Sequence, residues 1–253
     1  MASLKAPDPN GMPPIFFQHY WDSIGDDIVK TVLFCLNARE VLLCLNHTYI
    51  TLIPKVNSPK FIFEFRPIAL CNFLYKLVSK VLANRLKRVL PQIISESYST
   101  FQPNKAISDN ILVAFETLHH IKMKKVGRVG HVALKLDMSK AYDRLEWGFL
   151  KKIMEKMGFH PTWIGWIMEC IQSVTYSILV NGESNGHIIP SRGIRQGDPL
   201  SPYLFLLCSE DLNGIIQHSV DGGQIEGFLF VVPVQRFLTY FLQMIVSFFI
   251  GLR

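Results

Sequence analysis

The sequence of 253 residues lacks several features that would place it in a specialised class. Its five cysteines form no Cys-x-x-Cys pair and none stands beside a histidine pair at zinc-ligand spacing, which excludes a zinc finger and a disulfide framework. It contains no internal repeat or low-complexity tract, which excludes solenoid and collagen architectures. The first twenty residues contain no apolar stretch of the kind that directs secretion. These absences favour a reducing, intracellular compartment, and we expect the nucleus or the cytoplasm.

Long hydrophobic runs are scarce as well. The longest covers residues 237–252 and is interrupted by Gln243 and Ser247. It is shorter than the roughly 20 apolar residues that a membrane-spanning helix needs, so a membrane location is not expected. Because Arg236 and Arg253 flank this run, a tail-anchored membrane protein is the alternative.

The composition is that of a protein with a sizeable core and a basic surface. Hydrophobic residues make up 49% of the chain and charged residues 18%, which suits one large domain or two small ones. Lysine and arginine outnumber aspartate and glutamate by 26 to 20, a formal net charge of +6. This excess favours polyanionic partners, because it attracts phosphate groups to the surface.

Hydrophobic periodicity and turn residues predict both helices and strands. The helices are expected over 15–36 (one or two), over 74–90 with Pro91 ending the helix, and from Ser201 to about 217. The strands are expected over 48–54 and 132–137, and in a hairpin of 176–180 and 187–190 whose connection is 181–186. Asp137 then lies at the end of a strand.

Four cations lie mostly off the apolar stripe of the helix 74–90. They are Lys76, Lys80, Lys87 and Arg88. A row of cations neutralises successive phosphates, so the pattern indicates contact with a nucleic-acid backbone, with a solvated helix face as the alternative. Phe61, Phe63, Phe65 and Phe101 stand near basic positions where bases could stack, but we expect most of these rings in the core.

Four blocks of sequence, in order, resemble the motifs of one polymerase family. Residues 134–143, Leu-Lys-Leu-Asp-Met-Ser-Lys-Ala-Tyr-Asp, resemble motif A of reverse transcriptases. Residues 52–55, 65–68 and 72–76 resemble their fingers motifs, and 191–202, Ser-Arg-Gly-Ile-Arg-Gln-Gly-Asp-Pro-Leu-Ser-Pro, resembles motif B. The chain is most similar to the non-LTR (LINE-type) retrotransposon enzymes of plants.

This resemblance implies an α+β right-hand polymerase fold with fingers, a partial palm and an antiparallel palm sheet with packed helices. The expected divisions are an N-terminal leader and helical extension over 1–46, fingers over 47–130, a partial palm over 131–227 and an apolar tail over 228–253. The implied activity is RNA-directed DNA synthesis from dNTPs, with an RNA template, a DNA primer and Mg²⁺. No obligate protein partner is predicted.

The resemblance also implies roles for individual residues. Asp137, with the carbonyl of Met138, would hold Mg²⁺, a hard cation that prefers oxygen ligands, in a two-metal nucleotidyl transfer. Tyr142 matches the aromatic residue that crowds a ribose 2′-hydroxyl, and the alternative is a core tyrosine. The remaining nucleotide-binding residues implied are Lys55 and Arg66 on the triphosphate, or alternatively two surface cations, and Gln196 and Gly197 of motif B.

The aromatic-Ala-Asp-Asp turn of motif C is missing after motif B. Asp26 and Asp27 follow a glycine, but they precede motif A in a helical pattern and are read as a surface pair. With permitted codons, a shifted frame spells Ala-Asp-Asp across 242–245, which predicts a frameshift near 228–231 and an inactive polymerase. The alternatives are a noncatalytic nucleic-acid binder and a chain that does not fold stably.

Overall fold

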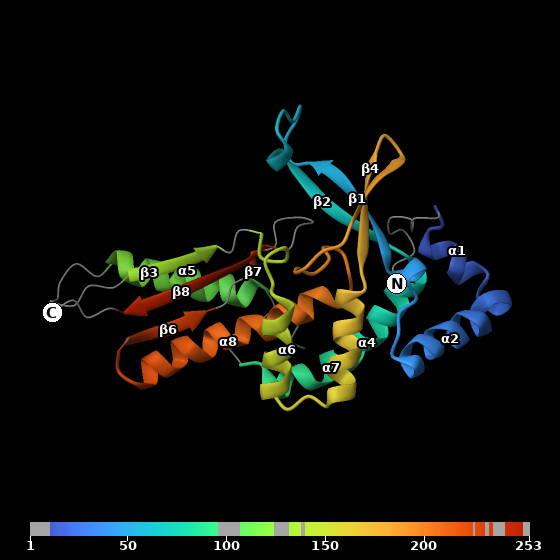
Figure 1. The fold of residues 1–253 in the computed structure, drawn as a ribbon. Helices are drawn as coiled ribbons and strands as arrows, with labels where there is room; N and C mark the ends of the chain where they lie inside the picture. The colour runs from blue at the N-terminus through green and yellow to red at the C-terminus, as the bar shows by residue number, and fades with distance from the viewer. Residues whose placement is uncertain are drawn as a thin grey trace. The chain divides into compact units, whose positions relative to one another are not determined.

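The computed structural model describes residues 11–95, 107–123, 132–137, 140–224, 226–230, 233–234 and 241–249 (Figure 1). The chain divides into two compact units. The first comprises Met1–Leu86 and Tyr142–Phe205, and the second comprises Lys87–Ala141 and Leu206–Arg253. Each is described by itself, and the four divisions expected from the sequence stay a prediction.

The first unit begins with two helices, α1 (Pro14–His19) and α2 (Trp21–Ala38), where the sequence left open one helix or two. The buried positions of α2, Ile28, Val32 and Cys35, recur every three to four residues, which turns one face of the helix toward the core. Asp26 and Asp27 are exposed on α2, which confirms the reading as a surface pair. The short helix α3 (Leu43–Asn46) follows.

This unit also contains a mixed four-stranded sheet, in the order β2-β1-β4-β5. The strand β1 (His47–Pro54) confirms the predicted strand and runs antiparallel to β2 (Phe65–Cys71). A single 3-10 turn, η1 (Ile62–Glu64), precedes β2. On its other side β1 runs parallel to β4 (Thr175–Val180), which pairs antiparallel with β5 (Glu183–Ile188).

The predicted six-residue connection of the hairpin β4–β5 is wrong. The strands meet through Asn181 and Gly182, whose φ angles are 52° and 87°. Two successive residues with positive φ form a type I′ turn, the tight connection that Asn-Gly favours. The Asn-Gly pair is therefore the sequence signal for this tight turn, and residues 183–186 belong to β5 instead of forming a loop.

The helix α4 (Phe73–Ile93) buries Val78, Leu82, Leu86 and Leu90 along one face. Contrary to prediction, Pro91 does not end this helix. It removes only one backbone hydrogen bond in the last turn, and the Ile94 amide still donates to the Leu90 carbonyl over 2.9 Å. Helices α6 (Trp147–Lys156) and α7 (Pro161–Gln172) pack together in the first unit, where Leu150, Met154 and Ile167 are fully buried.

The second unit has the antiparallel sheet order β3-β8-β6. The strand β3 (Val132–Asp137) confirms the strand predicted to end at Asp137, and β6 (Glu226–Phe230) flanks β8 (Phe241–Phe249) on the other side, with β7 (Pro233–Val234) also paired to β8. The helices of this unit are α5 (Ile107–Met123) and most of α8 (Ser201–Asp221). The helix α8 starts at the predicted residue and ends at Asp221, and its residues 201–205 belong to the first unit. No helix in the described ranges is long and apolar enough to cross a membrane.

Candidate functional site

The hairpin β1–β2 carries the two cations predicted to hold a triphosphate. Arg66 of β2 pairs with Ile53, and Lys55 follows the last residue of β1. The pleat of a sheet puts Ile53, its partner Arg66 and Lys55, two residues on, on one face. Lys55 is exposed and its Nζ donates to the Phe63 carbonyl over 2.8 Å. Arg66 is half-buried, and its Nε has no hydrogen-bond partner among the described residues.

The loop of motif B lies against β2, the edge strand of the sheet. The Ala69 amide donates to the Gln196 carbonyl over 3.2 Å. Gly197 has φ +103°, and a Cβ there would lie 3.5 Å from the Ala69 carbonyl, so the backbone conformation requires glycine. The structure thus brings Gln196 and Gly197 to the strand that carries Arg66.

A buried ion pair, which the sequence analysis did not single out, holds this loop. The side chains of Arg195 and Asp198 are each 2% exposed, and Nε of Arg195 lies 3.6 Å from Oδ2 of Asp198. The Arg195 guanidinium donates to Asn46 Oδ1 over 2.6 Å, to Thr48 Oγ1 over 3.2 Å and to the Cys170 carbonyl over 2.8 Å. The arginine therefore connects the loop to the start of β1 and to α7.

Asp198 connects the same loop to α4. It accepts a hydrogen bond from Tyr75 Oη over 2.7 Å, one from the Ser79 hydroxyl, and one from the Leu200 amide over 3.1 Å. The Arg195 guanidinium carbon lies 3.7 Å from the centroid of the Tyr75 ring, a cation–π contact. Burial raises the pKa of Tyr75 well above its usual value, so this phenol stays a donor.

The end of motif A and the residues that follow it are joined to motif B by backbone hydrogen bonds. The Gly193 amide donates to the Leu145 carbonyl over 2.7 Å, and the Ile194 amide donates to the Tyr142 carbonyl over 2.9 Å. Trp147 Nε1 donates to the Gly193 carbonyl over 2.7 Å. Gly193 has φ +92°, and a Cβ there would lie 3.1 Å from the Asp143 carbonyl. Glycine in a polar loop was the only sequence signal for this contact.

Tyr142 is half-buried at this junction. Its ring lies 5.5 Å from the ring of Phe205, in a tilted arrangement. This intermediate burial does not decide between the core tyrosine and the aromatic group beside a ribose.

The predicted metal ligands belong to the second unit. Asp137 is the last residue of β3, and its partner across the ladder is Gln243 of β8. Met138 lies outside the described residues. The structure therefore places Lys55, Arg66, Gln196 and Gly197 in the first unit, the cations on the hairpin β1–β2 and the motif B residues beside Ala69 of β2, while Asp137 ends a strand of the other unit.

The basic row of α4 occupies one sector of the helix. At 100° per residue, Lys76, Lys80 and Lys87 fall within about 40°, while Arg88 lies further round. Lys76 is half-buried, and Lys80, Lys87 and Arg88 are exposed. The row is therefore accessible to a polyanion along several turns.

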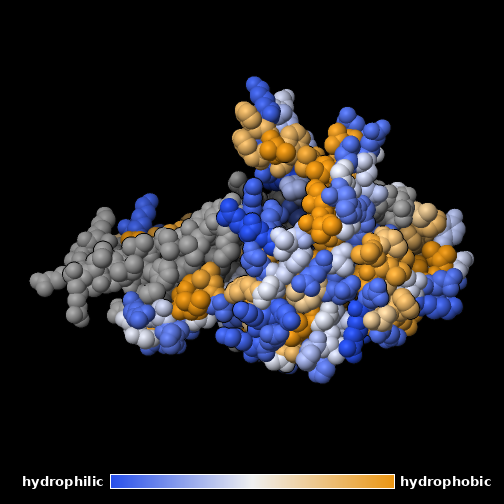
Figure 2. Space-filling model, viewed as in Figure 1, coloured by the Kyte–Doolittle hydropathy of each residue, from blue (hydrophilic) through white to orange (hydrophobic). Residues whose placement is uncertain are grey.

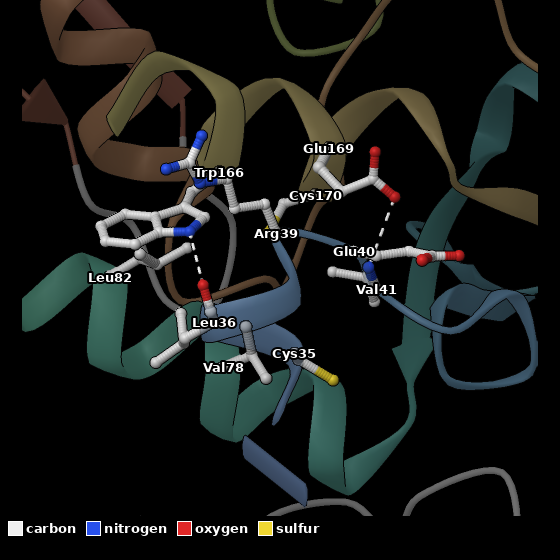
Figure 3. A pocket seen from close by; sticks show the side chains of 10 residues that line it. All are labelled: Cys35, Leu36, Arg39, Glu40, Val41, Val78, Leu82, Trp166, Glu169 and Cys170. Atoms are coloured by element: carbon white, nitrogen blue, oxygen red, sulfur yellow. Dashed lines mark hydrogen bonds between the residues drawn. The ribbon is translucent and has the colours of Figure 1, made fainter. Parts of the chain in front are cut away.

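One further pocket, between α2, α4 and α7, contains none of the predicted site residues (Figure 3). Trp166 Nε1 donates to the Leu36 carbonyl over 2.8 Å at one side, and the Val41 amide donates to Glu169 Oε1 over 3.4 Å at the other. Its volume of about 10 Å³ is near the minimum for one water molecule. A nucleotide does not fit there.

Residues 53–237 match the family described as reverse transcriptase (RNA-dependent DNA polymerase). The chain belongs to the reverse transcriptase family. The match begins near the end of β1 and includes β2, motif A and motif B.

Two relatives of this reverse transcriptase domain come from transposable elements of the non-LTR type. The domain is 28% identical over 222 residues to the transposon TX1 uncharacterized 149 kDa protein of Xenopus laevis, covering 88% of this chain and 17% of that protein. It is 27% identical over 208 residues to the Pol polyprotein of the type-2 element R2DM of Drosophila melanogaster, covering 82% of this chain and 19% of that protein. The chain thus spans about a fifth of the length of these relatives.

A solved structure shares the fold. Telomerase from Candida tropicalis, in complex with a fragment of telomeric RNA, superposes with a TM-score of 0.51 at 15% identity, covering 91% of this chain and 40% of that one. The reverse transcriptase domain therefore has the expected α+β architecture of polymerase fingers and palm.

The described residues do not fit the divalent metal ions that reverse transcriptases use. No group of three histidine, cysteine, aspartate or glutamate residues within the described ranges could hold a metal ion. In the four strands of the second unit the acidic residues are Asp137 and Glu226, and Glu226 pairs with Phe249, six residues along β8 from Gln243. At about 3.3 Å per residue this is roughly 20 Å, too far for shared coordination.

Proposed function

We propose that this reverse transcriptase domain keeps the nucleotide-binding and template-binding parts of its family and has lost DNA synthesis. The observation that carries the proposal is the pairing of Asp137 with Gln243, since a two-metal transfer needs several carboxylates and an amide replaces one here. The intact contacts of motif B support the retained half of the proposal. RNA template, DNA primer and dNTP are the ligands that the family implies.

The binding roles follow from the charges and the geometry of the first unit. Lys55 and Arg66, on one face of the hairpin, would hold a triphosphate by charge-assisted hydrogen bonds. Gln196, fixed at the edge of β2, would hydrogen-bond near the nucleotide or the template, and Tyr142 would crowd a 2′-hydroxyl. The basic row of α4 would contact phosphates.

Primer extension on an RNA template tests the loss of synthesis. We expect the purified chain and Asp137→Ala to give the same background, while fluorescence anisotropy shows that both bind an RNA–DNA primer-template with strong salt dependence. Extension by the chain that disappears in Asp137→Ala would overturn the proposed inactivity. Absence of binding would overturn the retained function.

We infer that a frameshift near 228–231 placed an amide in β8. With permitted codons, the shifted frame spells the Ala-Asp-Asp of motif C across 242–245, and the register of β8 puts this segment beside the end of β3. The coding DNA across codons 225–253 decides the matter, because another reading of that frame would remove the explanation.

We also propose a plant-type element acting in the nucleus or the cytoplasm. A segment of 49 residues is 51% identical to an uncharacterized mitochondrial protein of Arabidopsis thaliana, covering 19% of this chain and 40% of that protein, which supports the plant origin. A tagged copy seen by microscopy in plant cells would test the location, and enrichment at membranes would contradict it.

A further inference from the structure

The free end of the hairpin β1–β2 exposes a group of large apolar side chains. Phe61, Ile62 and Phe63 are 58%, 81% and 68% exposed, so the prediction that the phenylalanines are mostly core is wrong for two of them. Figure 2 shows the hydrophobic surface at the end of this projecting hairpin, next to hydrophilic residues. Phe65 is half-buried, and Phe101 lies outside the described residues.

The two rings form one stacked pair. The centroids of Phe61 and Phe63 lie 5.3 Å apart, and the ring planes differ by 6°. Stacking against each other covers one face of each ring at most and leaves the remaining surface in water. An exposed pair of parallel rings is a surface on which a further flat group can stack.

The backbone that carries this pair is already ordered. The Glu64 carboxylate accepts hydrogen bonds from the amides of Lys60 over 2.6 Å and Phe61 over 2.8 Å. The Lys55 amide donates to the Glu64 carbonyl over 2.7 Å, and Lys55 Nζ donates to the Phe63 carbonyl over 2.8 Å. A ligand would therefore meet a pre-organised surface and lose less free energy to ordering it.

The charges around the pair favour a polyanion. Lys55, Lys60 and Arg66 are the cations between positions 53 and 66, and Glu64 is the one acidic residue. One oxygen of its carboxylate, Oε2, accepts hydrogen bonds from two backbone amides. Aromatic rings among cations are the combination that binds single-stranded nucleic acid, because bases stack on the rings while the cations contact phosphates. A duplex does not offer unstacked bases.

We propose that Phe61 and Phe63 form a base-stacking platform for single-stranded nucleic acid. The platform rests on the proposed function in that the ligand is a nucleic acid. Its footprint is one or two bases, set by two adjacent rings, and it selects for unpaired bases and not for a particular base, since every base has an aromatic face.

The test uses the full chain and a fluorescent oligothymidylate of twelve nucleotides. We expect Phe61→Ala/Phe63→Ala to weaken anisotropy-detected binding by roughly tenfold or more. Phe34→Ala is the matched control, because Phe34 is 57% exposed on α2, and it should leave the affinity unchanged. Phe63→Tyr, which keeps an aromatic face, should bind like the unchanged chain and shows that the hairpin still folds.

A fully abasic strand of the same length separates stacking from charge. If bases stack on the platform, the double variant and the unchanged chain should bind a fully abasic strand equally, because no base is left to lose. If the double variant loses affinity equally for both strands, or loses none for the thymidylate, the platform is overturned while the proposed function stands. Absence of all nucleic-acid binding by the unchanged chain would overturn both. Self-association that the double variant abolishes would make the surface a protein interface and would also overturn the proposal.

Discussion

Asp137, the last residue of β3, pairs directly with Gln243 across the antiparallel ladder to β8. Partners in such a ladder lie on the same face of the sheet with their Cβ atoms about 5 Å apart. That spacing suits two carboxylates sharing a cation, and the chain supplies one. The pairing of Asp137 with Gln243 can be tested directly by substitution.

Gln243→Asp should create a cation site with Asp137. We expect the affinity for Mn²⁺, measured by titration with electron paramagnetic resonance, to rise by at least about tenfold, and Mn²⁺ to raise the melting temperature, because it relieves the repulsion of two opposed carboxylates. Ser247→Asp is the matched control, since Ser247 pairs with Ala133 on the same face of β8, about 13 Å further along. Equal gains in both variants, or a gain that persists in Asp137→Asn/Gln243→Asp, would contradict the pairing.

Breaking the buried pair of motif B should destabilise the domain strongly. Asp198→Asn leaves Arg195 charged in the interior, and we expect the free energy of unfolding in urea to fall by about 3–5 kcal/mol. Arg192 forms an exposed ion pair with Glu146 at 3.0 Å, so Arg192→Ala should cost less than about 1 kcal/mol. A similar decrease in the free energy of unfolding of both variants would mean that burial of the ion pair does not determine the destabilisation.

The contact of motif B with the end of motif A depends on a glycine. In Gly193→Ala the alanine has a strained φ of +92°, and its Cβ lies 3.1 Å from the Asp143 carbonyl oxygen. We expect the free energy of unfolding to fall by roughly 2–3 kcal/mol. Gly182 has a similar φ of +87° with nothing within 4 Å, so Gly182→Ala should cost only about 1–2 kcal/mol. The difference between the two, measured by urea unfolding, isolates the contact with Asp143.

Stability should fall as the solution is made acidic below neutral pH. Burial, with a smaller contribution from His187, lowers the pKa of His47 from its ordinary 6.5, and His47 Nδ1 lies 2.7 Å from Thr175 Oγ1. The unfolded chain then takes up a proton at a pH where the folded chain does not, so the folded state loses stability as the pH falls through 6.5 and the lowered value. Urea midpoints at pH 7.5 and 5.5 should differ less in His47→Gln. An unchanged difference would assign the effect to other groups.

The basic row of α4 should determine the salt dependence of nucleic-acid binding. Removing one phosphate contact with Lys87→Ala should reduce the slope of log affinity against log salt by about one. Lys30→Ala is the control, because Lys30 is an exposed cation of α2 that pairs with Asp27 at 3.3 Å. A slope that changes equally in both variants would reflect net charge and not a contact surface.

Much of the local structure could be predicted from the sequence. Helix starts, the strand that ends at Asp137 and the exposed Asp26–Asp27 pair depend on residues close in the chain, and the structure agrees. The tight β4–β5 turn also had a local signal in Asn181-Gly182, although the predicted six-residue connection was wrong. The motif blocks, read in order, were sufficient to indicate the family.

The sequence by itself determined which residue types this chain carries and where its periodicity begins and ends, because those depend on neighbours within a few positions. Only the tertiary structure decided that Arg195 and Asp198 are buried between β1, α4 and α7, that Phe61 and Phe63 stay exposed, and that Gln243 stands opposite Asp137. Burial and strand register are set by contacts between segments more than a hundred residues apart, and no local pattern specifies them.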